Sequence, residues 1–333
     1  MSDFQIIEVE NAGQLTQFCE ASDLPVLNPD AVARQKADVH WMIVDAKGKI
    51  NARCSLWWRD VPAYPGQRLG IMGHFAANSA EAADSLLKLA EKQLALQGCS
   101  LAVGPMDGNT WRSYRLVVER GSEPPFFLEP DNPDDWPAYF TENGYSIFSE
   151  YFSALIPDLG RQPSDLTKIA ERIRQRGIQI RSFNSEHFDQ ELRQIYGVSL
   201  DSFDRNFLYT PIDLSDFMST YQPIRAYIRP ELILIAEHDE QAVGFLFALP
   251  DLFQTRRGEA VDTVIIKTVA VRPAYQMLGL GNLLVARCEA AAHELGYKRS
   301  IHALMHQTNA SRKISQRHEA QRLRRYALFA KPL

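Results

Sequence analysis

The residues best placed to do chemistry lie in QMLGLG, Gln276–Gly281, between an apolar run and a long amphipathic segment. Glycine destabilises a helix by about 0.5–1 kcal/mol relative to alanine, so two glycines here indicate a backbone that turns tightly or approaches a ligand closely. The preceding apolar run ends at Val271, and Pro273 stops it. The first N–H groups of the following helix have no partner within the helix and lie at the positive end of its dipole. The sequence therefore predicts an anion site, suited to a pyrophosphate or a nucleotide phosphate.

Two well-known phosphate loops do not match this spacing. The stretch lacks the G-x-G-x-x-G of dinucleotide sites and the lysine and Ser/Thr of a P-loop. One alternative stays open, namely that the glycines only permit a turn between a strand and a helix.

The order of these residues resembles the GNAT superfamily of N-acetyltransferases, whose signature is a strand ending in V-x-P followed by [Q/R]-x-x-G-x-[G/A] at a helix start. This chain has Val271–Pro273 and then Gln276–Gly281, with Asn309 after the next strand. The resemblance covers residues 160–333 well and the earlier residues in outline. The segments ILIAEHDEQAVGFLFALPD and RRYALFAKPL are also similar to a bacterial group of tandem GNAT proteins.

The resemblance implies acetyl-CoA as co-substrate and no metal. In the family, the strand before the loop splays from its neighbour, and the pantetheine arm inserts like a further strand. Backbone groups near Val269 and Val271 would then hold the arm, and an N–H group there would stabilise the oxyanion formed when an amine attacks the thioester. The residues that the resemblance assigns to donor binding are Gln276, Met277, Leu278, Gly279, Leu280, Gly281 and Asn282.

Candidates for proton transfer lie at the end of the next strand and beyond it. His306 is a candidate base or acid because the pKa of a free imidazole lies near neutrality, and a structural histidine is the alternative. Asn309 and Ser311 could orient the thiol or the following turn, although Asn309 could also cap a helix. Many family members carry a tyrosine about seven residues after such an asparagine, where it protonates the leaving thiolate. This chain has Gln316 there, so the usual acid is absent from that position.

The helices that open the second part of the chain would line the acceptor site. The segment 196–222 carries four polar candidates among aromatic residues, namely Asp201, Asp204, Arg205 and Tyr209. Acidic groups there would suit an acceptor with an ammonium group, and an ordinary amphipathic helix and loop is the alternative. Lys267 and Asp262 flank the central strand, where we expect both side chains to face solvent.

The chain consists of two parts with the same order of elements. WMIVDAKGKINARCSLWW and ELILIAEHDEQAVGFLFALP each predict a β-hairpin, because two apolar runs flank a polar turn. A helix follows in each part, and with Gly98 set on Gly296 one apolar stripe appears twice. The stripe consists of Leu86, Leu87, Ala90 and Leu94 in the first helix and of Leu284, Val285, Cys288 and Ala292 in the second. This order indicates a duplicated domain, with chance recurrence of amphipathic patterns as the alternative.

The domain boundary is expected in IPDLGRQPSD, where prolines and polar residues interrupt the pattern. It separates a first half, residues 1–157, from a second half, residues 158–333. The length of 333 residues fits two domains. The predicted fold class is α/β, or α+β, with two tandem GNAT-like domains, each a mixed, mostly antiparallel sheet flanked by helices.

The first half departs from the GNAT motif at the decisive place. Under the same alignment, Asn78, Glu81 and Ala83 replace the glutamine and the two glycines of the loop. A carboxylate beside a pyrophosphate is a like-charge contact. We therefore predict a single acetyl-CoA site, in the second half, and a degenerate GNAT-like domain in the first.

Composition excludes several classes of protein. A net charge of -5 and a pI near 5.9 argue against binding of nucleic acid by the whole molecule. The four cysteines are widely spaced and predict buried thiols in a reducing compartment. Neither a secretory signal nor an apolar run of the roughly 20 residues that a membrane span needs is visible, so the expected location is cytoplasmic.

A basic tail begins at Arg312 and contains seven basic residues against Glu319, namely Arg312, Lys313, Arg317, Arg322, Arg324, Arg325 and Lys331. It suits a solvated helix face or the 3′-phosphate of CoA, and less well a nucleic acid.

The leading hypothesis is an N-acetyltransferase that moves acetyl from acetyl-CoA to a primary amine of a small molecule or peptide. The alternatives are a non-catalytic acyl-CoA-binding or regulatory protein and an aminoacyl-tRNA-dependent transferase of paired GNAT-like domains. A monomer is favoured if the duplication satisfies the domain-pairing surface, and a homodimer otherwise.

Overall fold

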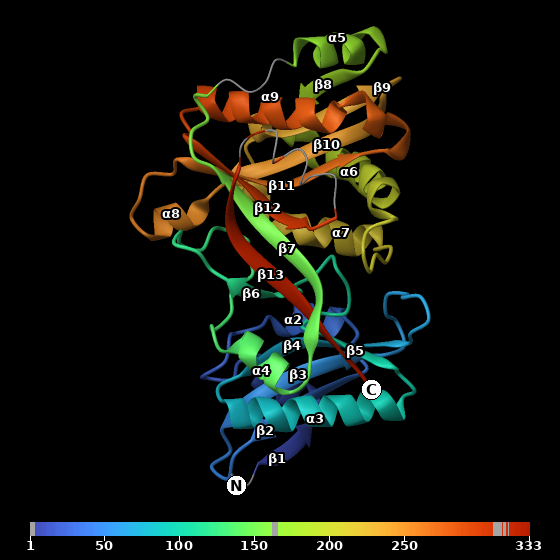
Figure 1. The fold of residues 1–333 in the computed structure, drawn as a ribbon, viewed down its shortest axis with the longest axis vertical. Coiled ribbons are helices and arrows are strands. Elements are labelled where there is room, and N and C mark those ends of the chain that lie inside the picture. The colour runs from blue at the N-terminus through green and yellow to red at the C-terminus, as the bar shows by residue number, and fades with distance from the viewer. Residues whose placement is uncertain (1–3, 162–165, 309–314, 316–317, 319) are drawn as a thin grey trace.

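The computed structural model describes residues 4–161, 166–308, 315, 318 and 320–333. The molecule is elongated, with the first half at one end and most of the second half at the other (Figure 1). The elements of the first half are β1 (Gln5–Glu8), α1 (Ala12–Cys19), α2 (Pro29–Arg34), β2 (Val39–Val44), β3 (Ile50–Trp57), β4 (Leu69–Ala77), α3 (Ala80–Leu96), β5 (Leu101–Gly104), β6 (Leu116–Glu119), α4 (Trp136–Glu142) and β7 (Ser146–Ile156).

The elements of the second half are α5 (Thr167–Gln175), β8 (Gln179–Ser182), η1 (Ser185–His187), α6 (Phe188–Phe203), α7 (Leu214–Tyr221), η2 (Gln222–Tyr227), η3 (Pro230–Leu232), β9 (Ile233–His238), β10 (Gln241–Pro250), α8 (Leu252–Arg256), β11 (Thr263–Val271), η4 (Pro273–Leu278), α9 (Leu280–Glu294), β12 (Arg299–His306) and β13 (Gln321–Pro332). The second half repeats the core of the first half's order, from β8 to β12, with α5, α8 and short 3-10 helices (letter η) in addition and no described counterpart of β6 and α4.

Several helices of the first half begin at capping residues. Asn11 and Asn28 precede α1 and α2, and their side chains accept hydrogen bonds from backbone N–H groups in the first turn. Ser79 does the same for α3, since its side chain accepts from the N–H of Ala82. Glycines at positive φ, Gly98 and Gly296, follow α3 and α9 and allow the left-handed turn that ends each helix.

One sheet of thirteen strands runs through the described part of the chain. Its order is β1-β2-β3-β4-β5-β13-β7-β12-β11-β10-β9-β8, with β6 paired to β13 off this path. The order is nearly symmetrical about the β13–β7 pair, because five strands of the first half lie on one side and five of the second half on the other. Both predicted hairpins are confirmed, since β2 pairs with β3 and β9 with β10, each antiparallel. The predicted fold class is confirmed.

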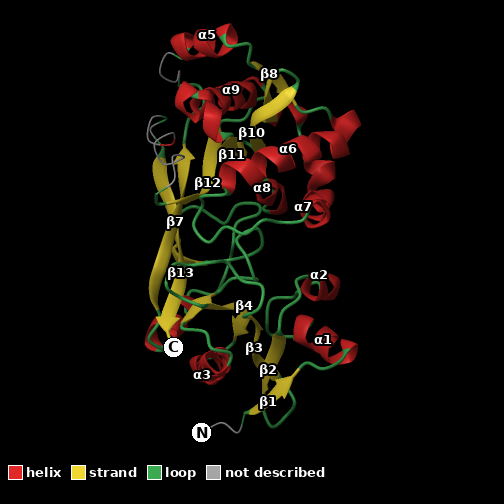
Figure 2. Cartoon of the chain, turned by 90° about the vertical axis from the view of Figure 1, so that its right-hand side faces the viewer, coloured by secondary structure: helices red, strands yellow, loops and turns green. Residues whose placement is uncertain are grey.

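The two longest strands are exchanged between the halves. The end of β7 pairs with β12, for example Ile156 with Ser300. The end of β13 pairs with β5 of the first half, for example Phe329 with Gly104. Both strands run side by side through the middle of the molecule and link its two halves (Figures 1 and 2). Because the sheet is continuous, the boundary between residues 157 and 158 stays a prediction.

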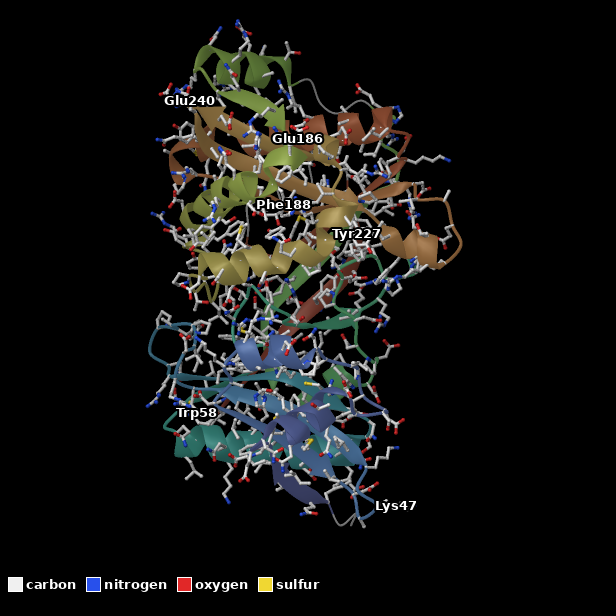
Figure 3. The ribbon with its side chains drawn as sticks, turned by 180° about the vertical axis from the view of Figure 1, so that it is seen from behind. Lys47, Trp58, Glu186, Phe188, Tyr227 and Glu240 are labelled. Carbon is white, nitrogen blue, oxygen red and sulfur yellow. The ribbon has the colours of Figure 1, made fainter. Side chains whose placement is uncertain are left out.

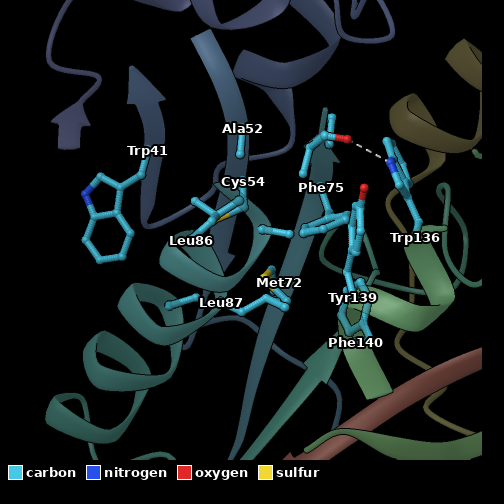
Figure 4. Close-up of a cluster of buried hydrophobic side chains, with 14 of the residues drawn as sticks. Trp41, Ala52, Cys54, Met72, Phe75, Leu86, Leu87, Trp136, Tyr139 and Phe140 are labelled. Carbon is cyan, nitrogen blue, oxygen red and sulfur yellow. Dashed lines mark hydrogen bonds between the residues drawn. The ribbon is translucent and has the colours of Figure 1, made fainter. Parts of the chain in front are cut away.

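Alternation along β2 explains the layers of the first half. Trp41 and Ile43 face α3, whereas Met42 and Val44 face α1 and α2. Figure 4 shows Leu86 and Leu87 of α3 directed at the sheet, and the indole N–H of Trp136 donates to the carbonyl of Ala77 at 2.9 Å. All four stripe residues of α3 are fully buried, which confirms the predicted stripe.

Helices also cover both faces of the sheet in the second half. The predicted stripe of α9 is buried, with Leu284 and Cys288 0% exposed, and it packs on β10 and β11. On the opposite face, α6 and α7 pack aromatic side chains such as Phe188 and Phe217 against β9 and β10. Figure 3 shows this face from behind, with Phe188 and Tyr227 in the second half and Trp58 and Lys47 in the first.

The four cysteines are buried free thiols, as the sequence predicts. No described helix is long and apolar enough to cross a membrane.

Candidate active site

The two parallel strands at the centre of the second half separate part-way along their length. β11 and β12 pair from Thr263↔Arg299 to Ile266↔His302, where the pairing ends. Beyond this point β11 follows β10 as far as Val271, and β12 follows β7. The positive φ of Leu304, +59°, lies at the register shift where β12 turns away. The splay that the GNAT resemblance implies is therefore present, and it is called the second-half splay below.

The second-half splay opens into a cavity of about 980 Å³, the central cavity, which residues of both halves line. On the β11 side its wall contains Lys267, Thr268 and Val269, and on the β12 side it contains the segment from Ala303 to His306. Aromatic residues of α6, α7 and β10 form a further wall, namely Phe203, Phe217, Tyr221 and Phe247. A cavity of this size accommodates a drug-sized organic ligand.

The predicted anion loop lies at the other end of the second-half splay. η4 follows β11, and Gly279 adopts φ +81°, a left-handed conformation that glycine reaches without strain. α9 starts there without any side-chain cap, and its first backbone bond runs from the N–H of Leu283 to the carbonyl of Gly279. The N–H groups of residues 280–282 therefore lie before the first helical hydrogen bond, where they can bind an anion.

The predicted donor residues have distinct surroundings around this loop. The amide of Gln276 donates to the carbonyl of Val271 at 3.1 Å and so ties the loop to the end of β11. Met277 is 91% exposed, whereas Leu278 and Leu280 are buried and anchor the loop in the core. Asn282 is buried, and its side-chain oxygen has no hydrogen-bond partner among the described residues. Together these residues fit a pyrophosphate, because the backbone is fixed and its donors are not used by a cap.

The first half contains the corresponding splay, but it is closed. Parallel pairing of β4 with β5 ends at Ile71↔Val103. The chain after β5 then bonds back to β4, because the N–H of Met106 donates to the carbonyl of Met72 at 2.8 Å. The same segment approaches Gly73 so closely that a Cβ there would lie 2.2 Å from the carbonyl oxygen of Met106. The gap that would admit a pantetheine arm is thus filled by the chain itself.

His306 lies on the central cavity, as a candidate for proton transfer should. Its Nε2 is 2.8 Å from the hydroxyl of Ser149, and its Nδ1 accepts from the N–H of Thr308 at 3.2 Å. Burial, and then the charge of Arg115, lower the pKa of His306, so it is neutral at pH 7. Both ring nitrogens have partners, so a proton would pass through Ser149 or Thr308. Asn309 and Ser311, together with Gln316, lie outside the described residues.

Of the four acceptor candidates, the structure brings one to the central cavity. Tyr209 is part of its lining and packs against Trp111. Asp201 is exposed and forms an ion pair with Arg272 at 3.0 Å, while Asp204 and Arg205 are exposed beyond the end of α6. The acidic groups that the sequence assigns to an ammonium group therefore lie outside the cavity lining.

Lys267 is a residue whose position the sequence did not reveal. The sequence led us to expect that its side chain faces solvent, but Lys267 lines the central cavity. It follows Ile266, the last residue of β11 that pairs with β12. Its ammonium group donates to the carbonyl of Leu128 at 2.9 Å. Burial, and then the nearby charge of Arg115, lower the pKa of Lys267 to about 7. The period of a strand cannot distinguish a cavity from solvent, so no sequence signal was available.

A second unforeseen cluster lies between α9 and β12. Glu289 accepts hydrogen bonds at 3.0 Å from His302 and Ser300, and His318 lies 2.6 Å from its other oxygen. Burial opposes the charge of Glu289, but the bonds from His302 and His318 hold its pKa at about 2. A signal existed here, because Glu289 interrupts the apolar face of α9.

The described part of the basic tail belongs to β13 and is paired. Arg324 bonds to Glu129 at 2.6 Å and Lys331 to Glu91 at 2.7 Å. Arg322 and Arg325 both lie near Glu119. These four charges are therefore neither a solvated helix face nor free for a phosphate, and the remaining three lie outside the described residues. Among the residues that are described, no group of histidine, cysteine and carboxylate side chains is arranged to hold a metal ion.

Comparison with known proteins agrees with this geometry. Residues 199–317 match the model of the acetyltransferase (GNAT) family. The bacterial ceramide synthase of Caulobacter vibrioides is 24% identical over 184 residues, which cover 54% of this chain and 48% of that protein. Protein YghO of Escherichia coli is 22% identical over 291 residues, which cover 78% of this chain and 74% of the relative. The alignment thus spans about half the length of the ceramide synthase.

Among solved structures, a tandem GNAT protein from the clavulanic acid biosynthesis pathway is similar to this chain with a TM-score of 0.50. The alignment covers 99% of this chain and 98% of that protein at 10% identity, so it shows the fold alone.

Proposed function

This chain belongs to the GNAT superfamily, and from that premise we propose that it is an acyl-CoA-dependent N-acyltransferase that acts by direct attack of an amine on the thioester. The observation that supports this most is the second-half splay, because it connects the uncapped start of α9 with the central cavity. The thioester of the donor would lie between β11 and β12. Its pantetheine arm would extend from there to the loop, and the acceptor amine would approach it from the cavity.

The donor is held by the chain through backbone groups. β11 is bonded to β10 along one edge, as in the pair Leu246↔Val269, so its other edge beyond Ile266 is available to the pantetheine arm. The N–H groups at the start of α9 would bind the pyrophosphate. An N–H group of β11 near Val269, directed at the thioester carbonyl, would stabilise the oxyanion.

Lys267 is the group best placed to take the proton of the acceptor. An amine attacks only when neutral, and a lysine whose pKa is about 7 is partly neutral at physiological pH. As the nitrogen forms its bond to the acyl carbon, the C–S bond breaks, the nitrogen loses a proton to Lys267, and the CoA thiolate leaves. The thiolate can then be protonated by water, or through the Ser149–His306 pair.

We propose acetyl-CoA as the first donor to test, with a small-molecule or peptide amine as acceptor. A ceramide is the N-acyl derivative of a long-chain base, so the name of the Caulobacter relative favours a longer acyl chain as the alternative. The aromatic walls of the central cavity would suit either an apolar acceptor or such a chain.

Calorimetric titration with acetyl-CoA tests the donor site directly. Wild type should bind close to one molecule per chain, and Gly281→Glu should lose binding because a carboxylate would face the pyrophosphate. Gly281→Gln has the same size without the charge and serves as the matched control. Binding unaffected by Gly281→Glu, or two molecules per chain, would contradict the proposed site.

Turnover is then measured as release of free CoA thiol with a panel of amines and with acetyl-CoA or palmitoyl-CoA. Release that depends on an amine supports the enzyme, and the better donor identifies the acyl group. Gln316 at the family's tyrosine position favours one second candidate, a non-catalytic acyl-CoA-binding protein. Tight binding without release of CoA under any of these conditions would support that candidate instead.

A further inference from the structure

Arg115 lies between β5 and β6 of the first half and lines the central cavity. Its side chain is buried, with the residue 9% exposed. The guanidinium carbon lies 3.9 Å from the ring centre of Tyr114 and 4.2 Å from that of Tyr151, so the cation contacts two aromatic rings, which also pack edge-to-face against each other. Cation–π contacts of this kind fix the position of the guanidinium.

Part of the hydrogen-bonding capacity of Arg115 is unused among the described residues. Nε and Nη1 of Arg115 are buried, and no described residue accepts a hydrogen bond from either atom. A buried charge without a partner is strongly unfavourable, and buried donors are normally satisfied. The structure therefore contains a desolvated cation on the lining of the central cavity, with two donors that no described residue satisfies.

The carboxylates around the central cavity do not neutralise Arg115, because other groups already bind them. Glu129 accepts from Arg324 at 2.6 Å and from the hydroxyl of Tyr326. Asp131 bonds to Arg120 at 2.7 Å, and Asp107 accepts from the backbone N–H of His74 at 2.6 Å.

The groups that do act on Arg115 from the second half are basic. The charge of Arg115 lowers the pKa of both Lys267 and His306, so the three side chains lie close enough to influence one another. An anion bound at Arg115 would satisfy its free N–H groups and offset its charge.

We propose that Arg115 binds an anionic group, a carboxylate or a phosphate, of the amine acceptor. This inference rests on the proposed function and narrows the acceptor to an amine that also carries an anion, such as an amino acid or a phosphorylated amine. The phosphates of the donor have their own loop at the start of α9, whereas Arg115 enters the cavity from the first half. The first half would thus supply the acceptor site of the second.

The first experiment measures anion binding without any turnover. The melting temperatures of wild type and Arg115→Met are compared with benzoate, with inorganic phosphate and with benzamide, the uncharged match of benzoate, at constant ionic strength. A ligand that binds only the folded protein raises its melting temperature. At least one anion should raise the melting temperature of wild type and leave the melting temperature of Arg115→Met unchanged. Which anion does so distinguishes a carboxylate site from a phosphate site. Equal shifts in both proteins, or none with either anion, would overturn the inference.

Two further variants keep this test interpretable. Arg115→Lys retains the charge without the planar fork and should show a reduced shift, which also covers the case in which Arg115→Met does not fold. Arg193→Met removes an exposed arginine of α6 and should behave as wild type.

The second experiment compares matched amines in the CoA-release assay. L-Tryptophan is paired with tryptamine, and O-phosphoethanolamine with ethanolamine. Wild type should prefer the anionic member of at least one pair by about tenfold or more in kcat/KM, as expected for a charge-assisted bidentate contact, and Arg115→Met should lose that preference. Wild type that uses the neutral members equally well would refute the inference while the acyltransferase stands. Anion binding without any CoA release would leave the anion site in place and count against the proposed enzyme.

Discussion

Each half of this molecule contains one splay, and the splay is closed in the first half and open in the second. In each half a pair of parallel strands separates after a few residues, at Ile71↔Val103 in the first and at Ile266↔His302 in the second. In the first half the chain after β5 closes the gap by bonding to Met72. In the second half β12 turns away along β7, and the gap opens into the central cavity. One arrangement of strands thus gives a closed core in the first half and an open cavity in the second.

The helices that follow the two splays, α3 and α9, differ in how their first backbone N–H groups are bound. Ser79 caps α3 with its own side chain, and Glu81 lies in the first turn, so the chain itself supplies the negative groups that a helix start favours. α9 starts at Gly279, which has no side chain to offer. The start of α9 therefore keeps a backbone donor of the kind that the side chain of Ser79 already binds at the start of α3.

The largest effect is expected from making the second-half splay resemble the first. Met72 and Lys267 are equivalent, because each follows the last paired residue before the strands separate. Lys267→Met therefore places in the second half the side chain that the first half has at this position. Without a group to take the proton, kcat should fall about 10²–10⁴-fold, while acetyl-CoA still binds. The release of CoA measures kcat, and calorimetric titration measures the binding of acetyl-CoA.

The pH profile sharpens this prediction. Because the pKa of Lys267 is lowered to about 7, the neutral base is present above that pH, so activity of wild type should rise through pH 7. Lys267→Arg stays protonated and should be as inactive as Lys267→Met. A rise at pH 7 that persists in Lys267→Met would assign the proton transfer to another group.

A smaller effect tests whether the halves are energetically independent. Leu86 and Leu284 are fully buried at equivalent positions of α3 and α9, and truncation of either to alanine should cost about 2–5 kcal/mol in the free energy of unfolding. Because β7 and β13 are exchanged, each variant should unfold in one transition, and acetyl-CoA should stabilise both. Two separate transitions, with only one sensitive to the ligand, would show that the shared sheet does not couple the halves.

The smallest effect concerns the cap of α3. Ser79→Ala should lower stability by about 0.5–2 kcal/mol in urea unfolding, through loss of the bond to the N–H of Ala82. It should not create a second donor site, because the closed splay beside it is unchanged. A stoichiometry above one in this variant would mean that the cap alone keeps the first half empty.

Much of the fold is contained in local patterns of the sequence. The stripes of α3 and α9 and both hairpins follow from periods of 3.6 and 2, and the structure confirms them. The exchange of β7 and β13 could not be predicted, because each strand would satisfy the same pattern in either half. For that reason the sequence shows two domains where the structure shows one sheet.

The candidate site divides in the same way. The loop before α9 is visible because Gly279 needs a positive φ and leaves a motif. Lys267 and Arg115 carry no such mark, since their roles depend on which surfaces meet across the central cavity. Asp201 and Asp204 show the converse, because acidic residues close to the site in sequence point to solvent and to Arg272.

The exchanged strands also affect the order in which the chain can complete its structure during synthesis. The free edge of β5 receives its partner only when residues 329–332 have left the ribosome, long after the rest of the first half has been made. Until then an unpaired β edge is exposed, which is a template for association with other chains. A nascent chain whose synthesis pauses within the second half should therefore depend on chaperones that cover the free edge of β5.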